Sequence, residues 1–256
     1  MSNFYFSVVN LYFKMAKMLQ GLVTALSFLT IIPFGKTIKQ EDLPKSIIFF
    51  PLVGLMIGGL LVLVRYLVSP FFSPSLTCLL VVGTWAALTG FLHLDGFCDT
   101  VDGLSGGRNK EDILRIMEEP NIGAKGAVAL VFLLLLKVFS IQGLSAFGLL
   151  IAPMMGRWAM VVASAMTSYP KPSGLGKPFV GYTKKKGLFV STLPVFVVLL
   201  RLNLFWHIVL TLLFVFVAVS YLKKRIGGIT GDNLGAICEI AETLTLLLVN
   251  SQLCKV

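Results

Sequence analysis

The stretch that decides the fold is SIIFFPLVGLMIGGLLVLVRYLV, residues 46–68, in which Arg65 is the only charged residue. About 20 consecutive apolar residues are enough for a helix to cross the hydrocarbon core of a bilayer. Comparable or somewhat shorter apolar runs cover residues 18–34, 75–92, 122–141, 144–168, 188–200, 204–222 and 234–249. The sequence therefore predicts an all-α fold, a polytopic integral membrane bundle of about six to eight transmembrane or re-entrant helices.

The composition points the same way. Hydrophobic residues make up 56% of the chain and charged residues only 13%, whereas soluble domains carry about 25% charged residues. We expect a single integral membrane domain over residues 1–256, with residues 1–17 as an N-terminal extension. The net charge of +10 does not indicate a nucleic-acid partner, because the basic residues lie in short loops without the interleaved aromatic residues of single-strand binders.

The loops between the apolar runs alternate in charge. All but one of the Lys and Arg residues in the loops from residue 35 to 233 fall in four alternate loops, at residues 35–45, 93–121, 169–187 and 223–233. Because an excess of Lys and Arg marks the cytoplasmic side of a membrane protein, these four loops are predicted to face the cytoplasm.

The stretch most informative about chemistry is HLDGFCDTVDG, residues 93–103. On a helix, the spacing of Asp95, Asp99 and Asp102 places all three carboxylates on one face. Such carboxylates repel each other unless a cation lies between them, and Mg²⁺ prefers oxygen ligands. The pattern favours a Mg²⁺ site in a cytoplasmic catalytic loop, although a solvated helix end rich in acidic residues would show the same spacing.

A glycine-rich stretch follows directly, with the sequence GLSGGRNK at residues 103–110. Glycines allow backbone N–H groups to approach a phosphate, and Arg108 and Lys110 could neutralise its charge. A linker without a binding function could have the same glycine-rich sequence. Asn109, with Asp112 three residues later, indicates the start of a short helix from Lys110 to about Glu118.

A second acidic group begins in the glycine-rich loop at residues 223–233. Asp232, Glu239 and Glu242 can share one helix face, and charged residues within a membrane helix usually face a polar cavity or a partner. Ion pairing with Arg157 or Lys137 inside the bundle is the alternative to a functional role. Since most of the 12 acidic residues lie in these two segments, we expect them to converge on one site.

These motifs resemble the cobalamin synthase family, the adenosylcobinamide-GDP ribazoletransferases. The resemblance rests on H-L-D-G-x-x-D-x-x-D-G at residues 93–103 and G-G-x-x-G-D-x-x-G-A-x-x-E-x-x-E at residues 227–242. Shorter matches are FPLVG at 50–54, GRW at 156–158 and GLG at 174–176. The resemblance extends from about residue 20 to about residue 250. Two positions depart from it, with Glu119 where an aspartate is expected and Lys171 where an arginine is usual.

The resemblance implies a reaction. A hydroxyl of α-ribazole, or of its 5′-phosphate, attacks the phosphate joined to cobinamide in adenosylcobinamide-GDP, GMP leaves, and adenosylcobalamin or its 5′-phosphate forms. Mg²⁺ as cofactor and a multi-pass location in the cytoplasmic (inner) membrane, with the active site facing the cytoplasm, are implied as well. The expected partners are the substrates and the lipid bilayer, and the chain could also form a homo-oligomer.

The site residues follow from the resemblance together with the charge pattern. Asp95, Asp99 and Asp102 are predicted as metal ligands and, with Asp232, as catalytic residues, the general base being any one of them. The predicted substrate-binding residues are His93, Arg108, Lys110, Arg157, Lys171, Glu239 and Glu242.

Two other functions share some of these features. A CDP-alcohol phosphotransferase also uses aspartates at the membrane edge, but its D-G-x-x-A-R motif is absent after Asp95-Gly96. An ion-coupled transporter could use the charged residues within the spans, but it should connect polar residues to both membrane faces.

Overall fold

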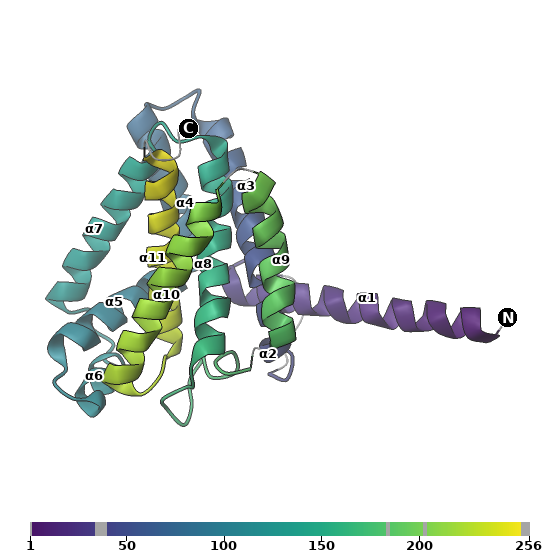
Figure 1. Ribbon diagram of the computed structural model, residues 1–256. Helices are drawn as coiled ribbons and strands as arrows, with labels where there is room; N and C mark the ends of the chain where they lie inside the picture. Colours follow the sequence, from purple (N-terminus) through teal and green to yellow (C-terminus); the bar gives the residue numbers. More distant parts are fainter. Residues whose placement is uncertain (1, 34–39, 183–184, 202–203, 252–256) are drawn as a thin grey trace.

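The computed structural model describes residues 2–33, 40–182, 185–201 and 204–251, and in these residues all regular structure is helical (Figure 1). Parts of the loops at 35–45 and 169–187 lie outside the described residues. The helices are α1 (Ser2–Leu29), α2 (Leu43–Ser46), the 3₁₀ helix η1 (Ile47–Phe49), α3 (Phe50–Val68), α4 (Pro74–Leu88), α5 (Leu92–Gly106), α6 (Lys110–Ile116), α7 (Ala124–Ile141), α8 (Ala146–Met166), α9 (Lys185–Arg201), α10 (Phe205–Ile226) and α11 (Gly231–Asn250).

The predicted all-α membrane fold is confirmed. Each of the eight apolar runs corresponds to a helix, namely α1, α3, α4, α7, α8, α9, α10 and α11. Among the described residues, four helical segments are long and apolar enough to cross a bilayer: α2 to α3 taken together, α7, α8 and α10. A fifth span results if α4 and α5 count as one broken segment. The helices are thus a mixture of candidate spans and shorter elements.

Helix α8 is the central element of the bundle. Nearly all its side chains are buried, and it packs against α3 on one side and α11 on the other. The contact with α3 is close at Gly54 and Gly58, where an added Cβ would lie 2.3 Å from the carbonyl oxygens of Pro153 and Leu150. Small residues allow the backbones of membrane helices to approach in this way, because dispersion contacts replace the missing hydrophobic driving force.

A sharp bend separates α4 from α5. The two helices meet at 88°, and the turn is made by two consecutive residues with left-handed backbone, Gly90 (φ 60°) and Phe91 (φ 58°). A bulky residue such as phenylalanine rarely adopts this conformation. As a result, α5 runs across the end of the bundle instead of continuing along α4 (Figure 1), and it carries the aspartates predicted as catalytic.

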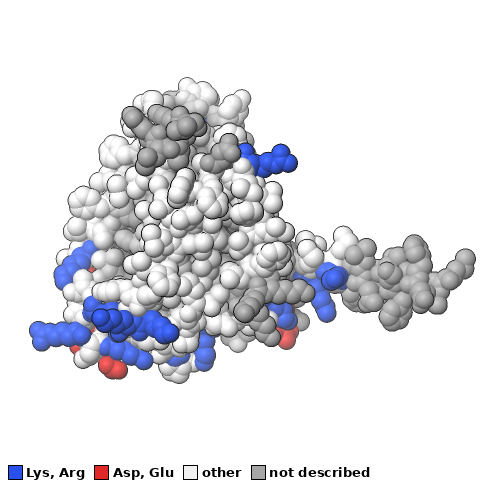
Figure 2. Space-filling view, in the orientation of Figure 1, with Lys and Arg blue, Asp and Glu red and all other residues white. Residues whose placement is uncertain are grey.

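Charge is distributed unevenly over the surface. Figure 2 shows Lys and Arg gathered over one end of the bundle and near the base of α1, whereas the side of the bundle is almost uncharged. Figure 1 shows the N-terminal part of α1, which contains the predicted extension, projecting away from the other helices. The charged end is the end where α5, α6 and the start of α11 lie.

Candidate active site

The site is built where α5 crosses the start of α11. Gly96 lies directly against this helix, since a Cβ added there would be only 2.7 Å from the Cα of Asp232. Gly235 faces the backbone of His93 in the same way, at 3.1 Å. Two glycines, one on each helix, therefore let the backbones touch. The aspartates of two segments more than 130 residues apart are brought together by this contact.

Hydrogen bonds fix the start of α11 in this position. Thr230 and Asn233 form a reciprocal capping box, in which each side chain accepts from the backbone N–H of the other. The amide of Asn233 also donates to Thr100 Oγ1 on α5 at 3.0 Å. Because Asn233 is fully buried, these bonds lock the register between α5 and α11 and so the position of Asp232.

Three carboxylates crowd together at this crossing. Burial and the like charges of Asp95 and Asp232 raise the pKa of Asp99 to about 7. Burial also raises the pKa of Asp232, although the nearby ammonium group of Lys171 acts in the opposite direction. Like charges this close disfavour each other's ionised form, although no group of three or more His, Cys, Asp or Glu among the described residues is arranged as a metal site.

A cavity of about 770 Å³ opens beside the carboxylates. Its polar rim contains Asp95, Asp99, Glu118 and Glu119, so that Glu119 keeps an acidic group at the position where the family resemblance suggested aspartate. Its apolar wall comes from α4, α5 and α7 through Leu79, Val82, Leu94, Leu130, Leu134 and Val138. The arrangement can receive a ligand that has both charged and apolar parts.

Lys171 is a cation whose charge acts on this acidic group. Its Nζ donates to Glu118 at 2.8 Å, and its charge lowers the pKa of both Asp99 and Asp232. The side chain is largely buried, with 13% exposed, whereas that of Glu118 is 64% exposed. Lys171 therefore lies at the boundary between the carboxylates and solvent, and its role in substrate binding stays a prediction.

Asp102 is hydrogen-bonded to the start of α7. Its carboxylate oxygens accept hydrogen bonds from the backbone N–H groups of Gly123 and Gly126, both at 2.8 Å. A Cβ at either glycine would collide with this carboxylate. Asp102 thus caps the N-terminus of α7, where a negative charge is favourable. Its predicted role as a metal ligand stays a prediction.

The glycine-rich stretch differs from the phosphate-binding turn expected from the sequence. Residues 103–106 form the last turn of α5, so their N–H groups belong to the helix. Gly103 and Gly107 instead allow α6 to pack closely on α5, and Arg225 of α10 donates to the carbonyl of Gly107 at 3.1 Å. Arg108 and Lys110 are exposed near the turn. Asn109 caps α6 by accepting from Asp112 N, as predicted.

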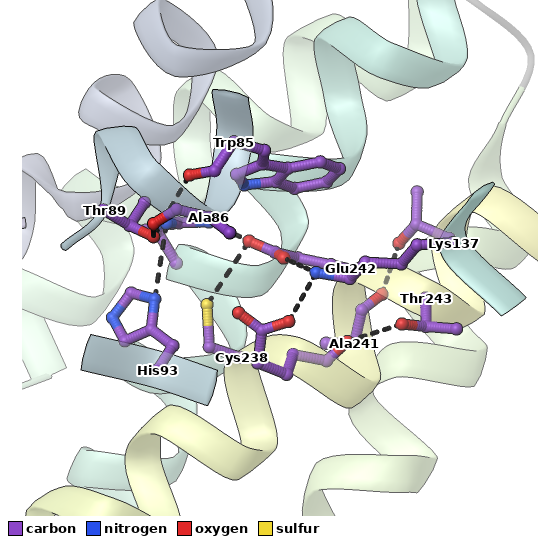
Figure 3. A network of polar contacts seen from close by, with 12 residues as sticks. Trp85, Ala86, Thr89, His93, Lys137, Cys238, Ala241, Glu242 and Thr243 are labelled. Atoms are coloured by element: carbon purple, nitrogen blue, oxygen red, sulfur yellow. Dashed lines mark hydrogen bonds and ion pairs between the residues drawn. The ribbon is translucent and has the colours of Figure 1, made fainter. Parts of the chain in front are cut away.

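The charged residues within the bundle form one buried network (Figure 3). Lys137 of α7 donates to Glu239 at 2.5 Å and to Glu242 at 2.6 Å, while Arg157 of α8 pairs with Glu242. Arg157 also contacts Nδ1 of His93 at 3.3 Å. The ion pairing considered as the alternative for these residues is thus present. Substrate contacts of Arg157, Glu239 and Glu242 remain a prediction.

Some residues of the site were missed at the level of sequence. The spacing of Thr230 and Asn233 is that of a capping box and could have been noticed. Gly123 and Gly126, by contrast, carry no signal that they receive the carboxylate of Asp102. Trp85, whose ring lies 4.3 Å from Lys137 Nζ, likewise looks like an ordinary core residue in the sequence.

Comparison with known proteins identifies the family. The family model described as cobalamin-5-phosphate synthase matches residues 21–250. The chain belongs to this family. A protein of Alkaliphilus metalliredigens named adenosylcobinamide-GDP ribazoletransferase is 42% identical over 89% of this chain and 93% of its own length. Proteins of the same name from Acetivibrio thermocellus and Herpetosiphon aurantiacus are 35% and 36% identical, each over 91% of this chain and over 98% and 96% of the relative. No solved structure matches the chain.

Membership of this family establishes the chain as a transferase of cobalamin biosynthesis, as the resemblance predicted. It argues against the two alternative functions, a CDP-alcohol phosphotransferase and an ion-coupled transporter. The residues of both motifs that carried the resemblance meet at the α5–α11 crossing, so the site described above is the candidate active site of the family.

Proposed function

We propose that the protein joins adenosylcobinamide-GDP and α-ribazole, or its 5′-phosphate, with release of GMP. In this reaction an oxygen of the nucleoside forms a bond to the phosphorus attached to cobinamide, and the bond from this phosphorus to the oxygen of GMP breaks. The proton of the attacking hydroxyl passes to a carboxylate. The observation that carries the proposal is the pair Asp95 and Asp99 at the edge of a cavity with an apolar wall, with Asp232 close enough for its charge to act on Asp99.

Phosphoryl transfer depends mainly on positioning and on neutralising charge. Lys171, held between Glu118 and the aspartates, can move to a phosphate oxygen once substrate arrives. Arg108 lies between α5 and α6, and Lys110 is the first residue of α6. Both are exposed and can bind a diphosphate that extends from the cavity. The carboxylates of Asp95, Asp99 and Asp232 offer acceptors for the proton of the attacking hydroxyl.

Magnesium is the cofactor we propose for this site. Mg²⁺ is commonly held by one or two protein carboxylates together with substrate phosphates, and Asp95 and Asp99 both line the cavity. Among the described residues no group of three or more His, Cys, Asp or Glu side chains is arranged as a metal site. The ion would neutralise charge on the diphosphate when bound, while Asp102 would hold α7 in place.

We also propose that the site faces the cytoplasm in the inner membrane. This orientation is supported by the collection of basic residues at the end of the bundle where the site lies, because Lys and Arg accumulate on the cytoplasmic side. Phosphorylated substrates are then available from the cytoplasm without crossing the bilayer.

The direct test is a product assay on protein embedded in liposomes. With adenosylcobinamide-GDP, α-ribazole 5′-phosphate and Mg²⁺, we expect equal amounts of GMP and of a cobalamin product, and neither in EDTA. Asp95→Asn and Asp99→Asn should each lower the rate at least about a hundredfold. Full activity of both variants would overturn the metal assignment, and folded protein that releases no GMP would overturn the function.

A further inference from the structure

A small cavity on the other side of α5 has His93 in its lining, a residue whose ring carries a buried nitrogen without a hydrogen-bond partner among the described residues. The cavity measures about 50 Å³ and lies between α1, α5, α8, the loop at 174–179 and the start of α11. Its polar lining comes from His93 and Asp232, and its apolar lining includes Phe28, Met160 and Phe179. It is distinct from the 770 Å³ cavity, with which it shares no lining residue.

The tautomer of His93 follows from its contact with Arg157. A guanidinium group has donors only, so the His93 Nδ1 atom that it contacts at 3.3 Å must accept. The proton of the neutral ring is therefore on Nε2. Figure 3 shows the other ring nitrogen of His93 pointing away from Lys137 and Glu242. Nε2 is buried, and it has no hydrogen-bond partner among the described residues.

An unpaired donor in a buried position is costly, because it loses water and gains nothing in exchange. His93 is only 2% exposed, and Arg157 is itself held by Glu242 within the buried network, so the ring is held in place. The lining of the cavity beside it includes both His93 and Asp232, so residues that can donate and accept a hydrogen bond border the same space. Asp232 in turn is oriented by Thr230 Oγ1, which donates to it at 3.3 Å.

A donor and a carboxylate together complement a hydroxyl group, which accepts one hydrogen bond and donates another. A phosphate offers only acceptors and would be repelled by Asp232. The volume suits one such group with its carbon atom, since a water molecule occupies about 30 Å³ in the liquid. The rings of Phe28 and Phe179, with centroids 4.8 Å apart, provide an apolar surface next to it.

We propose that this cavity binds a ribose hydroxyl of the acceptor nucleoside, with His93 Nε2–H donating to the hydroxyl oxygen and the hydroxyl donating to Asp232. The inference rests on the proposed function for the identity of the nucleoside. It assigns the acceptor to this side of α5 and leaves the larger cavity for adenosylcobinamide-GDP. Reactants on opposite sides of the carboxylates suit an in-line displacement at phosphorus.

The test compares binding of α-ribazole with binding of analogues that lack the 2′- or the 3′-hydroxyl, using liposome-embedded protein without the second substrate. We expect the unaltered protein to bind one of the two analogues about tenfold more weakly than α-ribazole, the effect of one lost hydrogen bond. His93→Phe should bind α-ribazole about as weakly as that analogue, and removing the hydroxyl should then make no further difference. His93→Gln, whose amide can donate from a similar position, should restore part of the preference.

His207→Phe is the matched control. His207 is the other histidine of the chain and is also buried, with ring nitrogens that lack partners among the described residues, but it lies at the start of α10, which ends at the basic residues. The His207→Phe variant should keep the preference for α-ribazole over the deoxy analogue. In turnover, His93→Phe should raise KM for the nucleoside about tenfold and leave KM for adenosylcobinamide-GDP unchanged.

The outcomes separate this inference from the proposed function. If the unaltered protein releases GMP, the function stands whatever the binding results. The hydroxyl site would be overturned if His93→Phe still preferred α-ribazole over the deoxy analogue. It would also be overturned if His93→Gln had lost that preference entirely. A His93-dependent preference without GMP release would support the hydroxyl site and overturn the function. Equal binding of all three nucleosides by the unaltered protein would overturn the hydroxyl site.

Discussion

Gly96 on α5 lies so close to Asp232 on α11 that a Cβ at Gly96 would be 2.7 Å from the Cα of Asp232. This contact brings the two acidic segments together. Gly96→Ala must push α11 away from α5, and the carboxylates with it. We expect kcat to fall about a hundredfold, since displacements of about 1 Å have effects of this size, while the protein still inserts and folds. The measurement is GMP release in liposomes.

Gly59→Ala is the matched control for this substitution. Gly59 is also a helical glycine, and an added Cβ there meets nothing within 4 Å. Its activity should stay within about twofold of the unaltered protein, because alanine is a better helix former than glycine and nothing has to move. Equal losses in Gly59→Ala and Gly96→Ala would show that the effect is not specific to the α5–α11 contact.

The buried network predicts a large effect on stability. Glu242 pairs with both Arg157 and Lys137, and all three side chains are at most 4% exposed. Glu242→Gln leaves a buried positive charge without compensation, which typically costs about 3–5 kcal/mol. We expect this loss in the free energy of unfolding, measured by denaturation in mixed micelles.

The surface pair of Lys45 and Asp42 provides the comparison. Their charged atoms are 3.7 Å apart, and the side chain of Lys45 is 64% exposed. Lys45→Gln should change the free energy of unfolding by less than about 0.5 kcal/mol, because exposed ion pairs are worth little. If Glu242→Gln were as mild as Lys45→Gln, the network would not contribute to holding α7, α8 and α11 together.

The sequence predicted the helices well and the details of the site less well. Apolar runs of bilayer length and the spacing of Asp95 and Asp99 are local properties, and the structure retains both. The 88° bend before α5 depends on Gly90 and on Phe91 in an unusual conformation, which no local pattern specified. Asp102 shares the periodicity of the other aspartates, yet it turns to α7 because Gly123 and Gly126 leave room for its carboxylate. Such tertiary hydrogen bonds cannot be read from spacing.

The raised pKa of Asp99 predicts a dependence of stability on pH. Its pKa rises from an ordinary value of 3.8 to about 7, so between these values the folded protein keeps a proton that the unfolded chain has lost. Stability should then fall as pH rises from about 4 to about 7. We expect the melting temperature in EDTA to fall over this range, and Mg²⁺ to reverse the fall by binding the carboxylate.

Asp99→Asn isolates this contribution from the other titrating groups. The variant cannot ionise at this position, so its melting temperature in EDTA should vary less with pH, and Mg²⁺ should stabilise it less at pH 7.5. An identical pH dependence in Asp99→Asn and the unaltered protein would contradict the crowding of carboxylates described above.

Asp102 and Asp95 should respond differently to replacement by asparagine. Asp102→Asn loses the charge at the N-terminus of α7 and one of two hydrogen bonds, which should cost about 1–2 kcal/mol of stability. The Mg²⁺ concentration for half-maximal activity should stay nearly unchanged. Asp95→Asn, at an exposed position on the cavity rim, should instead raise that concentration more than about tenfold. A comparable rise in Asp102→Asn would show that Asp102 is a metal ligand after all.

Lys171 should contribute to substrate binding through its charge. It lies close enough to Asp99 and Asp232 to lower the pKa of both, and its partner Glu118 is mostly exposed. Lys171→Met removes the cation while keeping an apolar stem, so we expect KM for adenosylcobinamide-GDP to rise about tenfold and kcat to fall. Lys171→Arg should keep activity or increase it, because a guanidinium group can bind a phosphate through two parallel hydrogen bonds.

Glu118→Gln is the control that breaks the ion pair between Lys171 and Glu118 from the other side. If Lys171 mattered only through that pair, Glu118→Gln would reproduce the loss, whereas a phosphate-binding role predicts that Glu118→Gln retains a KM close to that of the unaltered protein.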